Sequence, residues 1–321
     1  MSRFLQLTFH KCGSQWVRDV LSSPELQVAS GTTLSPGGGT ILHISSDWPE
    51  QSDQTFLGPL YNASTSDWMT HRRDSDKSVV ILRDPRDLIV SLLLSSAYSH
   101  GTGTNYYFPL LREPLLALDN RNRMILGIFA FRSISQSFSS WSNSVPTTST
   151  YVTKYERLAE NPLAEFARIV EFFGWQIPDR LLASVVDRFS FTARSGRKPG
   201  TEEVYSHYRK GVIGDWKNYF DKGVGSLFEG LFPGLLNRLG YEQDSEWPQS
   251  LVDEIEPRRI DETNDGRQPA INELRASLAQ SIEDKHWLQY LCREKDQMIE
   301  QLSAANKENL AVIESLQRRS K

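Results

Sequence analysis

Cysteine and long apolar runs are the features that this 321-residue chain has least of. Its two cysteines, Cys12 and Cys292, lie in segments of different character and provide no disulfide framework. No run of about 18 apolar residues is present, and the segment up to Leu7 is too short for the apolar region of a signal peptide. These absences predict a soluble, reduced, cytoplasmic protein without a transmembrane segment.

A surplus of basic residues is also missing. The 36 Lys and Arg residues against 40 Asp and Glu residues give a formal net charge of −4, which argues against general affinity for nucleic acid. No group of His and Cys residues has the spacing of a metal site, so we expect no metal. A hydrophobic content of 39% fits a globular protein, and the length allows one large core plus an appendage.

The character of the chain changes twice. Residues 1–242 alternate short apolar runs with helical patterns, which predicts an α/β fold with a central, mostly parallel sheet covered by helices. Residues 243–270 are acidic and poor in apolar residues, as is typical of a linker. In residues 271–321, apolar residues recur at alternating three- and four-residue spacing. This spacing predicts a coiled-coil helix about 70 Å long that forms a homo-oligomer or docks on a partner, and the alternative is a helix folded back on the core.

Individual elements of the α/β region are also predicted. The expected strands are residues 4–7, 40–44, 78–82 and 150–154. The expected amphipathic helices are residues 163–173 and 179–189. Residues 31–39 and 101–107 are predicted loops, the second of them a lid over substrate.

The run from Thr8 to Trp16, which we call the anion loop, is the most informative segment. It follows a predicted strand, opens a predicted helix, and contains Lys11, Gly13 and Ser14. Turn amides and a helix N-terminus direct positive dipole at a bound anion, and a Lys side chain adds a full charge. The nucleotide-binding loop GxxxxGK[ST] places its Lys after the second Gly, which is not the order here. Taken alone, the run also fits a simple helix cap.

Two later segments carry further groups that bind anions. The predicted strand 78–82 ends at Arg83, and the helix that follows contains Ser91, so a bidentate Arg and a hydroxyl can meet at one phosphate. Residues 208–217, which we call the basic loop, read Tyr-Arg-Lys-Gly-Val-Ile-Gly-Asp-Trp-Lys. The glycines of the basic loop allow its backbone to approach an anion closely.

These motifs resemble those of the sulfotransferases that use 3′-phosphoadenosine-5′-phosphosulfate (PAPS). That family carries a Lys-Ser-Gly-Thr-Thr-Trp-like loop, an Arg-x-x-x-Asp-x-x-x-Ser motif and an Arg-Lys-Gly-x-x-Gly-Asp-Trp-Lys loop, which correspond in order to residues 11–16, 83–91 and 209–217. A fourth similar element is Lys-Tyr-Glu-Arg-Leu at 154–158, followed by Asn-Pro and Phe-Phe-Gly. The resemblance covers about residues 3–222 and implies a three-layer, P-loop-like α/β fold.

The resemblance also implies roles for the anion loop. Lys11 would contact the phosphosulfate and stabilise charge on the bridging oxygen. Gly13, Ser14 and Gln15 would donate hydrogen bonds to the 5′-phosphate. Cys12 and Gln15 stand where the family usually has Ser and Thr, so their side-chain roles stay open while the backbone roles are retained.

The other cofactor residues follow from the remaining motifs. The 3′-phosphate, which separates PAPS from ordinary nucleotides, would be held at the strand end and enclosed by the basic loop. The residues implied are Arg83, Ser91, Arg209, Lys210 and Gly211 for this phosphate, and Trp16, Tyr155 and Ser190 for adenine. Core packing is the alternative for Trp16 and Tyr155. Arg86 and Asp87 are expected to cap and brace their helix, and Asp215 and Trp216 are expected to hold the basic loop, rather than to touch ligand.

The general base is the least determined residue. The family commonly has a His in a Lys-Thr-His motif, and here Met-Thr-His at 69–71 lacks the Lys and places His71 only 12 residues before Arg83. A His with an ordinary pKa of about 6.5 suits proton transfer from a hydroxyl. His71 is therefore the predicted base. The alternatives are His43, Asp47 and Asp67, with His100 and His207 expected to line the acceptor cleft.

The resulting hypothesis is an enzyme that transfers a sulfuryl group from PAPS to a hydroxyl or amine and releases 3′,5′-adenosine diphosphate (PAP). The acceptor is a small molecule, a glycan or a glycolipid, since similar tails accompany enzymes of surface-glycan assembly. One alternative is an inactive scaffold that acts through its coiled coil. The other is a nucleotide kinase, which needs a Lys that the anion loop lacks at the required place.

Overall fold

The computed structural model describes residues 2–35, 42–43, 52–99, 112, 115–142 and 147–255. The chain divides into two compact units, Met1–Pro257 and Arg258–Lys321, and the described residues all belong to the first. The predicted coiled coil and the lid at 101–107 lie outside the described residues. Within the described part, no helix has both the length and the apolar character needed to cross a membrane.

The described unit alternates strands and helices. The strands are β1 (Phe4–Thr8), β2 (Thr33–Leu34), β3 (Leu42–His43), β4 (Thr55–Tyr61), β5 (Lys77–Leu82) and β6 (Thr150–Lys154). The α-helices are α1 (Ser14–Leu21), α2 (Pro24–Ser30), α3 (Thr65–His71), α4 (Pro85–Leu94), α6 (Asn120–Ser140), α7 (Tyr155–Glu160), α8 (Pro162–Phe173), α9 (Asp179–Arg188), α10 (Phe191–Ser195), α11 (Lys222–Leu231) and α12 (Leu235–Arg238). The short helical turns are η1 (Ser95–Ser99), η2 (Asp215–Asn218) and η3 (Trp247–Ser250).

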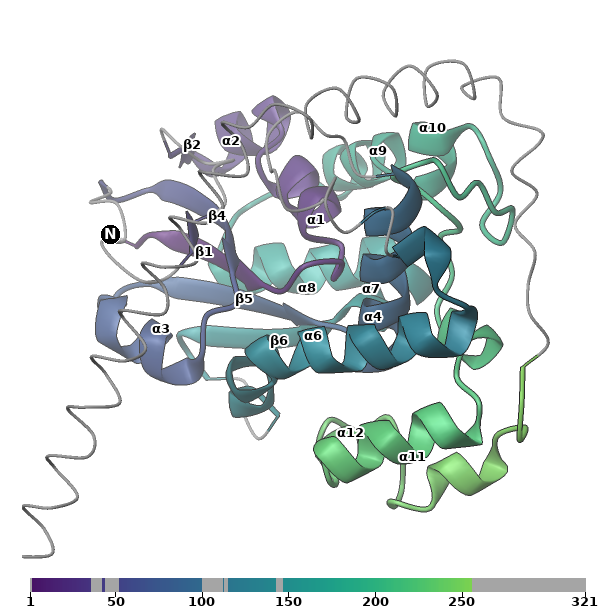
Figure 1. The fold of residues 1–321 in the computed structure, drawn as a ribbon. Helices are drawn as coiled ribbons and strands as arrows, with labels where there is room; N and C mark the ends of the chain where they lie inside the picture. The colour runs from purple at the N-terminus through teal and green to yellow at the C-terminus, as the bar shows by residue number, and fades with distance from the viewer. Residues whose placement is uncertain are drawn as a thin grey trace, which may run out of the picture. The chain divides into compact units, whose positions relative to one another are not determined.

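The strands form one parallel sheet in the order β2-β4-β1-β5-β6, with β3 paired to β4 (Figure 1). This confirms the predicted parallel sheet. At the carboxyl edge, Thr8 of β1 lies opposite Tyr61 of β4 and Ile81 of β5. Leu82 of β5 in turn lies opposite Lys154 of β6. The segments that follow β1, β4, β5 and β6 therefore leave the sheet along the same edge.

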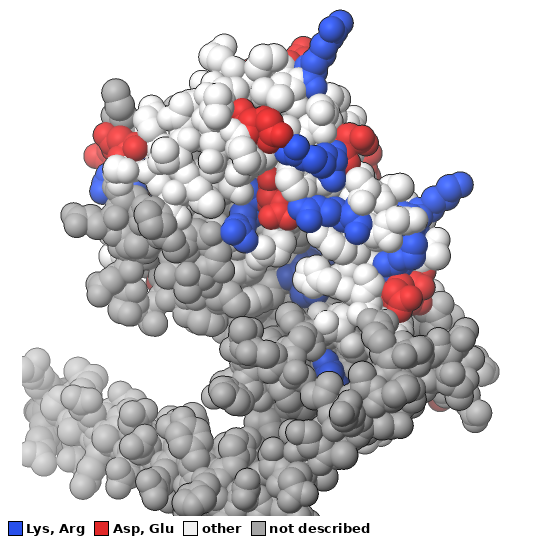
Figure 2. Space-filling model, turned by 90° about the horizontal axis from the view of Figure 1, so that it is seen from above, with Lys and Arg blue, Asp and Glu red and all other residues white. Residues whose placement is uncertain are grey.

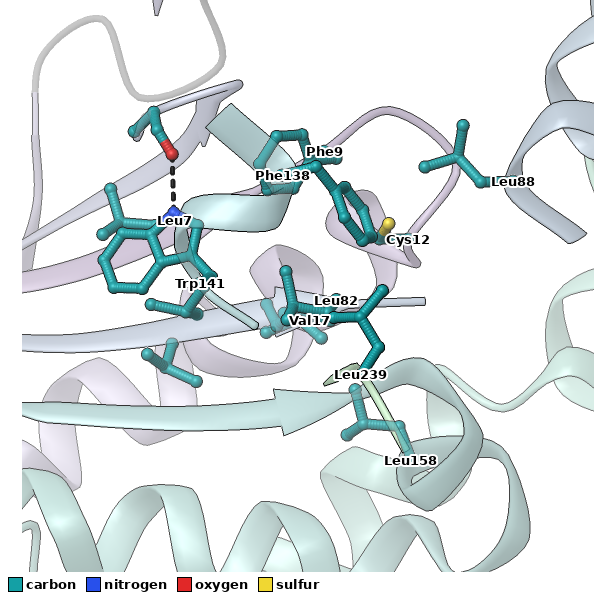
Figure 3. Close-up of a cluster of buried hydrophobic side chains, with 14 of the residues drawn as sticks. Leu7, Phe9, Cys12, Val17, Leu82, Leu88, Phe138, Trp141, Leu158 and Leu239 are labelled. Carbon is teal, nitrogen blue, oxygen red and sulfur yellow. Dashed lines mark hydrogen bonds between the residues drawn. The ribbon is translucent and has the colours of Figure 1, made fainter. Parts of the chain in front are cut away.

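Helices cover both faces of the sheet (Figure 1). On one face α1 packs on α8, with Trp16 and Phe166 in an edge-to-face contact at 5.7 Å. On the other face α3 meets the end of α6 through Trp68 and Trp141, whose rings are 6.0 Å apart. Figure 3 shows part of the core, in which Trp141 donates a hydrogen bond of 2.7 Å to the Ala63 carbonyl.

Strand β4 is a strand that the sequence did not predict. It contains Gly58-Pro59, a pair of residues that is typical of turns and breaks. Its side chains are nevertheless all buried, because β4 lies between β1 and the outer strands β2 and β3. The pairing register shifts between Leu5 and Leu7 of β1, opposite this Gly-Pro pair.

The predicted helices at 163–173 and 179–189 are confirmed as α8 and α9. The described fold, however, continues past the predicted boundary at 242. Trp247 in η3 is buried and packs edge-to-face on Trp216 at 5.8 Å, so the start of the acidic segment belongs to the folded unit. One apolar residue in a polar stretch is enough to fix a short segment when a pocket of aromatic side chains receives it.

Candidate active site

The anion loop connects β1 to α1 at the carboxyl edge of the sheet. Lys11 and Gly13 both have left-handed backbone angles, with φ of 66° and 76°. The first hydrogen bond inside α1 runs from the Val17 amide to the Gly13 carbonyl at 3.1 Å, so the amides of residues 14–16 have no partner within the helix. Three amides and the positive end of the helix dipole thus meet at this turn, which is the arrangement that binds anions.

Gly13 is required by close packing as well as by its backbone angle. A β-carbon at this position would lie 2.8 Å from the Tyr155 ring. Tyr155 opens α7 directly after β6, so the anion loop and the end of β6 are in contact. Two of the segments that carry predicted site residues are therefore neighbours in the fold.

Lys11 lies among other cations. Burial, followed by the charges of Arg83 and Arg209, lowers the pKa of Lys11 to about 8. Arg83 also donates a hydrogen bond of 2.8 Å from Nη1 to the Lys11 carbonyl. The structure thus brings together one predicted cation from each of the three motifs. Concentrated positive charge of this kind favours a ligand with several negative charges.

The Arg83 side chain packs on the aromatic ring of Tyr155. Its guanidinium lies 4.4 Å from the centre of the Tyr155 ring, a cation–π contact. Arg83 is 8% exposed, and its Nε atom is buried and makes no hydrogen bond within the described residues. A buried N–H without an acceptor costs about 1 to 3 kcal/mol, so an anionic acceptor here would remove a penalty.

The structure places the Cys12 side chain, whose role the sequence left open, in the hydrophobic core. Its side chain is fully buried beside Phe9 and Phe138, as Figure 3 shows, and its amide donates to the Phe9 carbonyl at 3.3 Å. Burial raises the pKa of the Cys12 thiol. A small residue is needed at this position because its side chain packs into the hydrophobic core.

Ser14 and Gln15 share a partner that the motifs did not indicate. The Ser14 and Tyr61 hydroxyls are 2.8 Å apart, and Gln15 donates from Nε2 to the Tyr61 hydroxyl at 3.2 Å. Tyr61 ends β4 and stacks flat on the His10 ring, with centres 4.3 Å apart. Since β4 itself was not predicted, no feature of the sequence pointed to Tyr61.

Of the predicted adenine residues, Trp16 and Tyr155 lie beside each other, and Tyr155 directly follows β6. Trp16 is partly buried and meets Tyr155 edge-on at 6.5 Å, and its indole N–H makes no hydrogen bond within the described residues. Ser190 caps α10 by accepting a 3.2 Å hydrogen bond from the Ala193 amide. Trp16 also packs on Phe166, so core packing, the alternative role for Trp16, accounts for part of its contacts.

The basic loop is held together by its own ion pairs. Arg209 donates to Glu202 and, at 2.6 Å, to Asp215, and Lys210 donates to Asp215 at 2.6 Å. Gly211 has φ of 64°, and a β-carbon there would lie 2.5 Å from Phe191 of α10. Ser91 is partly buried in α4, two turns beyond Arg83.

Arg86 is one of the residues expected to have a structural role, and its contacts are all with protein groups. The Arg86 guanidinium pairs with Asp84 at 2.7 Å and with Glu242 at 2.5 Å. It also lies 3.6 Å from the centre of the Trp216 ring. With 2% of its surface exposed, Arg86 has no surface left for a ligand.

The structure places His71, the predicted base, at a distance from the anion loop. The His71 carbonyl accepts a 3.3 Å hydrogen bond from Arg3, which pairs with Asp76 at 2.5 Å. Arg3 precedes β1 and Asp76 precedes β5, so His71 lies at the amino edge of the sheet. The anion loop lies at the carboxyl edge, about 16 Å away along the five residues of β1.

The position of His71 follows from α3, which runs back from the end of β4 to the start of β5. Among the alternatives, Asp67 caps α3 together with Ser64. The side chain of His43, together with Asp47 and His100, lies outside the described residues.

His207, by contrast, lies near Lys11 in space. It lies on the exposed surface just before the basic residues of the basic loop. Burial of part of its ring, then the Lys11 charge, lowers its pKa below the ordinary value. An imidazole that stays neutral at neutral pH can accept a proton.

Figure 2 shows the described surface from above, where Lys and Arg side chains alternate with Asp and Glu side chains. On this described face, basic and acidic side chains are neighbours and do not form one continuous basic surface.

Comparison with known proteins agrees with these features. The model of the sulfotransferase domain family matches residues 2–240, and the chain therefore belongs to this family. Sulfotransferase 6B1 of Danio rerio is 23% identical over 163 residues, which cover 49% of this chain and 50% of the relative. Sulfotransferase 2B1 of Mus musculus is 27% identical over 169 residues, covering 49% and 46%. The chain thus spans about half the length of these curated relatives.

Among solved structures, the chain is similar to mouse sulfotransferase SULT7A1 complexed with PAP. The identity is 18%, the TM-score is 0.48, and the match covers 73% of this chain and 84% of that chain.

Proposed function

We propose that this protein is a PAPS-dependent sulfotransferase that transfers a sulfuryl group to a hydroxyl or amine. The observation that carries the proposal is the convergence of Lys11, Arg83 and Arg209 beside the amides that open α1. Membership of the sulfotransferase family supports the reaction class. The donor carries a phosphosulfate and a second phosphate, and the site offers cations at two places for them.

The order of the strands supports one placement of this donor. The 5′-phosphosulfate lies on the anion loop after β1, against Lys11 and the amides of residues 14–16. The 3′-phosphate lies after β5, between Arg83 and the basic loop residues Arg209, Lys210 and Gly211. Adenine lies towards β6, near Tyr155, Trp16 and Ser190.

In this placement each residue has a defined task. Bound PAPS supplies the sulfuryl group, and the acceptor oxygen or nitrogen forms a bond to sulfur as the bond from sulfur to the 5′-phosphate oxygen breaks. Lys11 stabilises the charge that develops on that oxygen. Arg83 and the basic loop fix the far end of the nucleotide, which holds the reacting atoms in position. The acceptor proton passes to a base.

We assign the base to His207 in place of His71. Replacing His207 with Gln is expected to lower kcat about 100-fold or more, the usual size of a general-base contribution, with PAP affinity nearly unchanged. His71→Gln is the matched control and should leave kcat unchanged, since His71 lies at the opposite edge of the sheet. Equal activities of the two variants would refute the assignment.

The pH profile provides a second readout. Because the pKa of His207 is lowered, the neutral form persists to a lower pH than for an ordinary histidine. The ratio kcat/KM, which reports the free enzyme, should therefore fall only when the pH drops below that lowered pKa. The His207→Gln variant should lose this acid limb.

The proposed function is tested by titration calorimetry of the full chain with PAP and by transfer from labelled PAPS to a panel of acceptors. We expect binding of PAP that is tighter than binding of adenosine 5′-phosphate (AMP), together with labelled product. Absence of heat with PAP would overturn the proposal. Binding without transfer to any acceptor would favour the inactive scaffold.

We further propose a glycan or glycolipid acceptor in the cytoplasm and an oligomer formed through residues 271–321. The supporting observation is the three- and four-residue spacing of apolar residues in that segment. Light scattering should give more chains per particle for the full chain than for a chain that ends at Pro257, where the first compact unit ends. Equal numbers of chains per particle would exclude this mode of assembly.

A further inference from the structure

Asp87 connects two segments that the proposed site brings together. It lies in the first turn of α4, one turn after Arg83, and is 2% exposed. Its Oδ2 accepts a 2.7 Å hydrogen bond from the Gly214 amide, and its Oδ1 accepts a 2.9 Å hydrogen bond from the Trp216 amide. Arg83 Nη2 lies 3.7 Å from the same carboxylate. One buried carboxylate thus contacts both the strand-end arginine and the backbone of the basic loop.

The two amides bound by Asp87 flank Asp215. Asp215 is 4% exposed and accepts hydrogen bonds from Arg209 and Lys210, each at 2.6 Å. Because Asp87 binds the amides on both sides of Asp215, it also sets the position of Asp215. The chain of contacts therefore runs from Asp87 through Asp215 to the two cations of the basic loop.

Charge excludes Asp87 itself as a ligand for phosphate. A carboxylate beside a bound phosphate is repelled by it, and Asp87 has almost no exposed surface. The donors that remain for an anion are Arg83 Nε, which makes no hydrogen bond within the described residues, and the cations of the basic loop. Asp87 thus contacts Arg83 and the backbone of the basic loop without being a ligand itself.

We propose that Asp87 is a positioning residue that makes the site selective for a 3′-phosphorylated nucleotide. It anchors the basic loop to α4 so that Arg83 on one side and Arg209, Lys210 and Gly211 on the other close on the same phosphate. The proposal rests on the proposed function, because it takes that phosphate to be the 3′-phosphate of the donor. Asp87 reaches the anion loop only indirectly, through Arg83, which donates to the Lys11 carbonyl. We therefore expect recognition of the 5′ end to depend much less on Asp87 than recognition of the 3′-phosphate does.

The test compares PAP with AMP, which lacks the 3′-phosphate, by calorimetry on the full chain. The Asp87→Asn substitution keeps the size of the side chain, but it weakens the pairing with Arg83 and turns an NH2 group towards one of the two amides. PAP affinity should fall at least tenfold, while AMP affinity stays within about twofold. A role in folding alone would change both affinities together.

Asp221→Asn is the matched control. Asp221 is also a buried aspartate, 3% exposed, that accepts a 2.8 Å hydrogen bond from the Val224 amide and lies 3.7 Å from an arginine, Arg121. This variant should lose comparable thermal stability and keep the wild-type ratio of PAP to AMP affinity.

A second measurement on the unaltered protein covers the case in which Asp87→Asn does not fold. Hydrogen exchange of the Gly214 and Trp216 amides should slow at least tenfold with saturating PAP and change little with AMP. An unchanged affinity ratio in a folded Asp87→Asn protein overturns the inference, as does exchange that PAP leaves unchanged. If the wild type itself shows no preference for PAP over AMP, the proposed function fails, and the inference fails with it.

Discussion

Replacing Lys11 with Ala is expected to abolish measurable sulfuryl transfer, with kcat reduced at least ~100- to 1,000-fold, while PAP affinity changes by less than about tenfold. The reason is that the charge on the bridging oxygen appears only as the bond to sulfur breaks, and Lys11 is the cation we assign to that oxygen. In the ground state, Arg83, the basic loop and the amides of α1 still hold the nucleotide. Transfer from labelled PAPS and calorimetry with PAP measure the two quantities separately.

The Lys11→Arg variant is the control for charge. The pKa of Lys11 is about 8, so the charged form and with it kcat/KM of the wild type should decline as the pH rises above about 8. Arginine stays protonated over this range, and the remaining activity of Lys11→Arg should lack the alkaline decline. Full activity of Lys11→Ala would remove Lys11 from the mechanism.

Replacing Arg83 with Ala is expected to weaken PAP binding by about 2 to 3 kcal/mol, which is a ~30- to 150-fold rise in Kd. Arg83 is nearly buried, so its loss leaves a bound phosphate with fewer charged hydrogen bonds and no compensating water. AMP affinity should change much less, since AMP has no 3′-phosphate. Calorimetry with both nucleotides checks the prediction.

The Arg83→Lys variant separates charge from geometry at the same position. A lysine keeps the charge but loses the bidentate fork, so an intermediate PAP affinity is expected. Thermal melting is needed beside the titrations, because Arg83 also binds the Lys11 carbonyl and packs on Tyr155. An Arg83→Ala protein that is folded and binds PAP like the wild type would place the 3′-phosphate elsewhere.

The parallel sheet, helices α8 and α9 and the meeting of three distant motifs were predictable from the sequence. Each of these rests on a local pattern, such as the Pro162 start and the Gly174 end of α8, that the final fold does not override. The strand ends then meet of necessity, because parallel strands place their carboxyl ends at one edge. Asp87 was expected to brace its own helix, and its hydrogen bonds to the Gly214 and Trp216 amides were not foreseen.

The parts that were not predictable depend on contacts between distant residues. The pair Gly58-Pro59 indicates a turn, and only the neighbours of β4 make it a buried strand. Because β4 was not predicted, nothing in the sequence indicated that Tyr61 would contact Ser14, which is 47 residues away in the chain. His71 was predicted as the base from its likeness to a Lys-Thr-His motif, whereas α3 carries it back along the sheet.

The orientation of Cys12 has a consequence for how such proteins are detected. Its side chain packs in the hydrophobic interior while the neighbouring amides face outward, so position 12 is constrained by volume and not by polarity. A hydroxyl, a thiol or a methyl group would satisfy the same space. Motif searches that demand a hydroxyl amino acid there will overlook members of this kind, whereas a profile weighted on the left-handed glycine and the preceding lysine will retain them.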